Sequence, residues 1–128
     1  MIVDSSALLA ILRGEPEADA FIDAIAAAAN PTLSAATWLE AAIVVDSRRD
    51  PALSRDFDRL VAPLAIAPVT EAQARRARDA YRDFGKGSGH PAQLNLGDCF
   101  VFALAEESGA PVLFKGEDFK RAGLVTAV

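Results

Sequence analysis

The stretch MIVDSSALLAILRG, residues 1–14, joins a short apolar strand to a helix and so indicates the fold. The apolar residues 1–3 predict a buried strand, and the apolar run 7–12 predicts a helix. Asp4 and the two serines after it offer side-chain oxygens that cap a helix N-terminus, and Gly14 is a typical helix stop. A strand that leads directly into a helix is the first unit of an alternating chain.

This alternation continues to the end of the sequence. Further strands are predicted at residues 32–33, 65–67 and 111–114, with a last short one at 124–125. Helices are predicted at residues 16–28, 35–48, 51–61, 70–84 and 96–108. Strands separated by helices form a mostly parallel sheet that is covered on both faces. The expected fold class is therefore α/β, in a single domain that spans residues 1–128.

Composition narrows the possible functions. The 128 residues, with 52% hydrophobic side chains, suffice for one domain with its own core. The net charge of −5 excludes nucleic-acid binding by bulk electrostatics, so RNA or DNA would need a local patch, a metal ion or a partner. The single cysteine, Cys99, excludes an internal disulfide, and its apolar neighbours predict a buried side chain. Neither a signal peptide nor a membrane span is predicted, and the expected location is the cytoplasm.

Three acidic residues are predicted to meet at one edge of the sheet. Asp4 directly follows the first strand, and Asp118 lies in the turn after the strand at 111–114. Asp98 lies in the first turn of a helix that opens at the same edge. Ligands of parallel α/β sheets bind at the carboxyl ends of the strands, so we expect these carboxylates to lie close together.

A fourth acid, Glu40, is predicted on the apolar face of a helix. The positions three and four residues from it carry Ala36, Thr37, Ile43 and Val44. No lysine or arginine lies within four residues of Glu40 on either side. An ionised carboxylate on an apolar face needs a partner, and a bound cation is the expected one.

Four carboxylates without a nearby histidine or cysteine suit a hard cation such as Mg²⁺ or Mn²⁺. Such an ion removes the repulsion between clustered acids. It also lowers the pKa of a bound water and stabilises charge on a phosphoryl oxygen. This chemistry predicts hydrolysis of a phosphodiester, with either one or two ions.

Each acid also has a purely structural explanation. Asp4 would be an ordinary cap of the first helix. Asp98 stands three residues after Asn95, where an acid complements a helix N-terminus. Asp118 would be a turn residue, and Glu40 would lie at the edge of its helix face and reach water.

Four motifs, in order along the chain, carry a resemblance to a known family. They are MIVDSSAL at residues 1–8, ATWLE at 36–40, HPAQLNLGDCF at 90–100 and LFKGEDF at 113–119. At these motifs the sequence resembles the PIN-domain ribonucleases, and more narrowly the VapC-type toxins of bacterial VapBC toxin–antitoxin systems. The similarity runs over essentially the whole chain.

The resemblance implies a three-layer sandwich whose central parallel sheet has about five strands. It places Asp4, Glu40, Asp98 and Asp118 at the acidic metal-binding positions. Ser6 matches a polar position beside the first acid, where its hydroxyl would bind a ligand or metal-bound water, although helix capping explains it equally well. Glu117 departs from the family, where asparagine is more usual.

The resemblance also implies an activity and partners. The activity is Mg²⁺- or Mn²⁺-dependent endoribonucleolytic cleavage of structured RNA, such as tRNA or rRNA. The partner is a cognate VapB-type antitoxin that inserts a segment into the active-site groove. A homodimer is expected, with a heterotetramer or larger assembly when the antitoxin is bound.

Basic residues cluster on the predicted helix at 70–84 and in the glycine-rich loop after it. Arg75, Arg78 and Arg82 line one stripe that would follow a phosphate backbone, unless interleaved acids such as Asp79 simply pair with them. Lys86, between flexible glycines, is the better RNA contact. Two further candidates flank Asp118, namely Lys115 and Lys120.

Two other functions compete with a nuclease. An aspartyl phosphatase is disfavoured because no second acid stands two residues after Asp4. A non-catalytic module that holds a basic peptide in the acidic cleft remains open. A ribonuclease with two catalytic histidines is excluded, because His90 is the only histidine.

Overall fold

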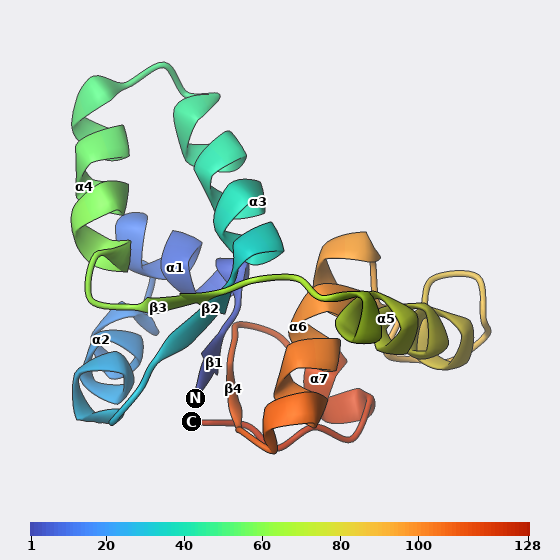
Figure 1. The fold of residues 1–128 in the computed structure, drawn as a ribbon. Helices are drawn as coiled ribbons and strands as arrows, with labels where there is room; N and C mark the ends of the chain where they lie inside the picture. The colour runs from blue at the N-terminus through green and yellow to red at the C-terminus, as the bar shows by residue number, and fades with distance from the viewer.

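The computed structural model describes residues 1–128 and contains one sheet of four parallel strands. The strands are β1 (Ile2–Val3), β2 (Thr32–Ser34), β3 (Ala65–Ala67) and β4 (Val112–Leu113). They are ordered β3-β2-β1-β4, with Ile2 of β1 paired to Thr32 on one side and to Val112 on the other (Figure 1). The predicted parallel sheet is confirmed.

The expected fifth strand is the one departure. The tail forms only an isolated bridge between Thr126 and Val112. Val112 donates its backbone N–H to Val125 at 2.9 Å, and Ala127 donates to Val112 at 2.8 Å. Because pairing centres on this single residue of β4, no ladder develops and the sheet has four strands.

The predicted helices are present, and a short α7 is added. Their bounds are α1 (Ser5–Leu12), α2 (Ala18–Ala27), α3 (Ala35–Asp46), α4 (Pro51–Val61), α5 (Glu71–Phe84), α6 (Leu96–Ser108) and α7 (Asp118–Arg121). Side-chain oxygens accept backbone N–H groups at the start of five of them, from Asp4, Ser34, Asp50, Thr70 and Asn95. These caps satisfy donors that have no partner inside the helix, which is why the helices begin there.

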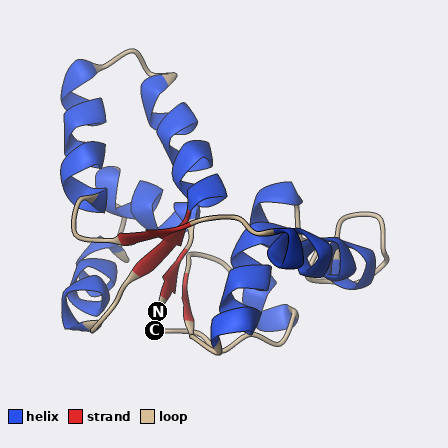
Figure 2. Cartoon of the chain, viewed as in Figure 1, coloured by secondary structure: helices blue, strands red, loops and turns tan.

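Two layers of helices cover the two faces of the sheet. Alternate strand residues point to opposite faces. Val3, Leu33 and Leu113 pack with side chains of α1 to α4, whereas Ile2 and Val112 pack with those of α5 to α7. Figure 2 shows the strands between these two groups of helices. The three-layer arrangement is therefore confirmed.

The strand order creates a crevice beside β1. The chain runs from β1 to β2 to β3 in one direction, and then returns to place β4 on the other side of β1. Ligands of open α/β sheets bind at such a switch point, outside the carboxyl ends of the strands. Asp4 follows β1 there, and the turn that contains Asp118 follows β4.

Smaller predictions are also decided by the structure. Cys99 is buried as expected, and burial raises the pKa of its thiol to about 11. The only histidine, His90, stabilises its own loop, because its Nδ1 accepts the backbone N–H of Ala92 at 3.1 Å. None of the helices combines the length and the apolar character needed to cross a membrane.

Candidate active site

A cleft of about 580 Å³ opens at the switch point between β1 and β4. Side chains from α1, α3, α6 and the segment after β4 line it. The lining includes all five residues that the sequence predicts for the site: Asp4, Ser6, Glu40, Asp98 and Asp118. The carboxylates are separated by up to 114 positions in the sequence, and the fold brings them to one place.

Asp4 is the most buried of the four acids, with 4% of its surface exposed. Its Oδ2 accepts the backbone N–H of Ser6 at 3.0 Å and the Ser6 hydroxyl at 2.5 Å. Burial raises the pKa of Asp4, the two Ser6 hydrogen bonds oppose that shift, and the negative charge of Glu40 adds to it. Asp4 therefore caps α1 and lines the cleft at once, so the structural explanation and the site are compatible.

Ser6 connects the first acid to the turn after β4. Its hydroxyl donates to Asp4 and accepts the backbone N–H of Lys115 at 2.9 Å. The capping hydrogen bond at this helix comes from the Asp4 side chain instead. Ser6 thus fixes the orientation of the Asp4 carboxylate and ties α1 to the turn that leads to Asp118.

The prediction that Glu40 lies on the buried face of α3 is wrong. The buried face carries Thr37, Ala41 and Val45, while Ile43 is 59% exposed. Glu40 lies at the boundary of that face, half-buried, and reaches into the cleft. The apolar pattern misleads here because apolar side chains of α3 such as Ile43 lie exposed on the helix surface.

Two residues that the sequence analysis missed hold the Glu40 carboxylate. The Ser5 hydroxyl donates to Glu40 Oε1 at 2.7 Å. On the other side, Gly97 of α6 lies so close that a Cβ there would collide with the carboxylate. No local sequence signal identifies this contact, because Gly97 and Glu40 lie on different helices that are far apart in the sequence.

Asp98 lies in the first turn of α6 and forms a reciprocal cap with Asn95. Each residue accepts the backbone N–H of the other at 2.9 Å. Burial raises the pKa of Asp98 to about 6, the Asn95 hydrogen bond opposes this, and the charges of Asp4, Asp118 and Glu40 add to it. The charges of the other three cleft carboxylates therefore all act on Asp98.

Asp118 is the exposed member of the set and begins α7. Its neighbour Glu117 does not line the cleft and lies 3.9 Å from the Lys120 ammonium group. Asp118, rather than Glu117, is thus the acid of this turn that faces the cleft. Lys120 does not line the cleft either, and its role as a phosphate contact stays a prediction.

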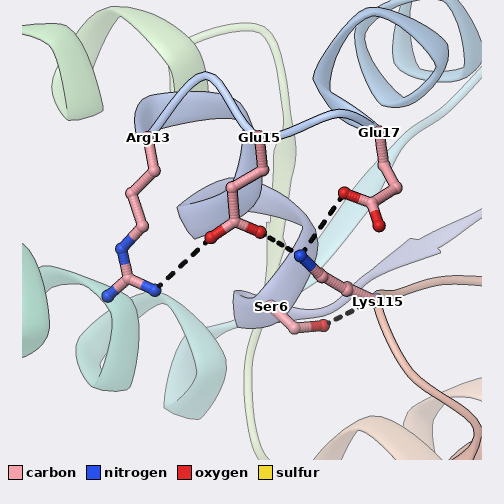
Figure 3. Close-up of polar contacts among 5 residues, drawn as sticks. All are labelled: Ser6, Arg13, Glu15, Glu17 and Lys115. Carbon is pink, nitrogen blue, oxygen red and sulfur yellow. Dashed lines mark hydrogen bonds and ion pairs between the residues drawn. The ribbon is translucent and has the colours of Figure 1, made fainter.

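Ion pairs form one wall of the cleft (Figure 3). Lys115 extends from the turn after β4 to Glu15 and to Glu17, with 3.4 Å between its Nζ and Glu17 Oε2. Arg13 approaches the other oxygen of Glu15 at 3.9 Å. The hydrogen bond to Glu15 is the main reason that the pKa of Lys115 is raised. The charge of Lys115 is already compensated, so it is a weaker RNA contact than the sequence suggests.

The donor set fits a hydrated hard cation better than a tightly enclosed ion. No group of three or more His, Cys, Asp or Glu side chains is arranged to hold an ion directly. The side chains of the cleft that could bind a metal ion offer oxygen atoms, and neither histidine nor cysteine lines it. Mg²⁺ typically keeps several water ligands and binds one or two carboxylates directly. Burial is the main cause of the raised pKa of Asp98, and a cation would relieve the carboxylate repulsion that adds to it.

The fold and the cleft define a class of protein: a parallel α/β domain with an acidic pocket at its switch point. The PIN domain family model matches residues 1–124. Ribonuclease VapC28 of Mycobacterium tuberculosis is 55% identical over 100% of this chain and 98% of its own length. The chain therefore belongs to the PIN-domain family, in the group of VapC ribonucleases.

Solved structures agree with this fold. VapC20 of Mycobacterium tuberculosis, described as a toxin that cleaves the sarcin–ricin loop, superposes with a TM-score of 0.74 at 19% identity, over 97% of this chain and 95% of that one. FitAcB of Neisseria gonorrhoeae gives a TM-score of 0.75 at 18% identity, over 98% and 94% of the two chains. At such identities the likeness concerns the fold alone.

Proposed function

We propose that this protein is a divalent-metal-dependent endoribonuclease that acts as the toxin of a type II toxin–antitoxin pair. The observation that carries the proposal is the convergence of Asp4, Glu40, Asp98 and Asp118 on one cleft. Clustered, partly buried acids destabilise a protein unless a cation or a proton compensates them, so their presence together in one cleft favours a bound cation.

In this proposal the four carboxylates bind a hydrated Mg²⁺ or Mn²⁺, one or two of them directly and the others through its water ligands. The ion supplies a Lewis acid and an activated water for attack on a phosphodiester. Asp4 and Asp98 are held in fixed orientations by Ser6 and Asn95, respectively. Ser5 and Gly97 position Glu40, so that little reorganisation is needed when an ion binds.

We further propose structured RNA, such as tRNA or rRNA, as the substrate and a cognate VapB-type antitoxin as the inhibitor. An acidic cleft is suited to a basic antitoxin segment, which would compete with the metal ion and with RNA. A homodimer, a heterotetramer or larger complex with antitoxin, and a cytoplasmic location complete this proposal.

The experiment that tests it is RNA cleavage by the purified protein with and without Mg²⁺. Total tRNA and rRNA should be cut at defined positions when Mg²⁺ or Mn²⁺ is present, and chelation by EDTA should abolish the cleavage. Re-addition of excess Mg²⁺ should restore it, which separates metal loss from inactivation. Cleavage that persists in EDTA would refute metal dependence, and no cleavage of any RNA would refute the nuclease.

A further inference from the structure

A second cleft, of about 570 Å³, adjoins the acidic one between α5, α6 and the loop that joins them. Asn95 lines both clefts, which places them side by side at the N-terminus of α6. The second cleft is mainly apolar, and its lining also includes Tyr81, Arg78, Lys86, Leu96 and Phe100.

The two cations of this cleft, Arg78 and Lys86, form no ion pair, whereas the other arginines of α5 do. On α5, Arg75 pairs with Glu71 at 3.6 Å and Arg82 pairs with Asp79 at 3.4 Å. The expected pairing of Arg75 with Asp79 is not the one observed. Arg78 and Lys86 are exposed and form no ion pair with any acid of the chain. In a protein of net charge −5, a pair of uncompensated cations beside an acidic cleft is a local positive site.

The Tyr81 ring of this cleft lies against Gly85. Tyr81 is 50% exposed, and its ring lies so close to Gly85 that a Cβ at this position would collide with it. The loop beyond is fixed as well, because Lys86 donates its backbone N–H to Leu94 at 3.0 Å and Leu94 donates to Phe84 at 2.9 Å. The Tyr81 ring and the backbone at Lys86 are therefore both held by contacts at the end of α5 and in the loop after it, and both residues line the cleft.

We propose that this cleft is a nucleotide subsite, in which an unpaired RNA base stacks on Tyr81 while Arg78 and Lys86 contact the flanking phosphates. Stacking on an aromatic ring is the usual way in which proteins hold splayed RNA bases. The inference rests on the proposed function, since it deepens the choice of substrate. It predicts that the cleaved RNA is single-stranded next to the scissile phosphate, as in a loop.

Two features favour RNA over a protein as the occupant of this cleft: its uncompensated positive charge and its direct connection to the acidic cleft. An apolar protein segment bound in this cleft would be stabilised by the apolar lining. It would also remove water from Arg78 and Lys86 without compensating their charges, which costs free energy. Phosphates compensate both cations, and the shared residue Asn95 lets one RNA strand pass from this cleft to the carboxylates. The subsite also explains how an acidic protein binds a polyanion.

The test is binding of a short fluorescent single-stranded RNA of mixed sequence, measured by anisotropy in EDTA at low salt. Without a divalent ion no cleavage occurs under the proposed function, so binding is read separately from catalysis. Tyr81→Ala should raise the Kd by about tenfold, and Tyr81→Phe should restore most of the affinity because it keeps the stacking ring. Arg78→Gln and Lys86→Gln should each lower the slope of log Kd against log salt by about one.

Arg75→Gln is the matched control, because this arginine lies on the same helix but pairs with Glu71 and lines another surface. It should bind RNA as the wild type does. Equal affinity of Tyr81→Ala and wild type, or no binding by the wild type, would overturn the subsite. So would a change of oligomeric state or antitoxin affinity in Tyr81→Ala with unchanged RNA binding. RNA binding lost on Tyr81→Ala without any Mg²⁺-dependent cleavage by the wild type would refute the nuclease but keep the subsite.

Discussion

Replacing Asp98 with asparagine is expected to lower Mg²⁺-dependent RNA cleavage by about a thousandfold or more. The loss of one charged ligand removes several kcal/mol of transition-state stabilisation, and each 1.36 kcal/mol corresponds to about a tenfold change in rate. The amide oxygen of asparagine can still accept the backbone N–H of Asn95, so the cap of α6 is kept. The measurement is the initial rate of cleavage of one RNA substrate at saturating Mg²⁺.

Asp83→Asn provides the matched control for this experiment. Asp83 is an exposed acid of α5 that lies 3.4 Å from Arg82 and outside the acidic cleft. The same change of charge there should leave the rate of cleavage within about twofold of the wild type, as is usual for surface substitutions. Full activity of Asp98→Asn would show that the cleft acids do not carry the reaction.

The second large effect concerns the pH dependence of stability without metal. The pKa of Asp98 rises from 3.8 to about 6 on folding. Between these values the folded state binds more protons than the unfolded state, so the contribution of Asp98 to stability falls as pH rises. Below pH 3.8 the destabilisation is absent, and above about pH 6 it is complete.

Asp98→Asn should therefore become more stable than wild type as the pH rises from about 4 to about 7, in the absence of metal. We expect a gain of about 1–2 kcal/mol in the free energy of unfolding, reduced from the full linkage value because Asp98 is partly solvated. Urea denaturation at several pH values in EDTA measures it. A difference that stays constant with pH would refute the raised pKa, and Mg²⁺ should reverse the order of stability at neutral pH.

Much of the fold follows from local sequence signals. Asp50 and Pro51 begin α4, and Asn95 and Gly109 delimit α6, as their capping chemistry predicts. The position of Asp4 directly after an apolar strand was enough to place it at the carboxyl edge of the sheet. The tail at 124–125 looks like a strand from its composition, but a bridge of one residue depends on tertiary contacts that composition does not encode.

The sequence predicts which acidic residues line the cleft better than it predicts the contacts that hold them there. Glu40 was chosen from an apolar pattern that the structure does not support, since Ile43 is exposed and Glu40 lies at a face boundary. Its contacts with Ser5 and Gly97 join segments that are far apart in sequence, and no local rule reveals them. Lys115 was chosen for its place beside Asp118, whereas its partners come from the loop between α1 and α2.

The proposed function requires that the four carboxylates form a site for a divalent ion. The decisive measurement is calorimetric titration with Mn²⁺ at neutral pH, in wild type and in the Asp4→Asn and Asp98→Asn variants. Wild type should bind one or two ions, and each variant should bind with an affinity lowered by at least about tenfold, because a hard cation depends on its charged oxygen ligands. Equal Mn²⁺ affinity in all three proteins, or no binding by the wild type, would contradict it.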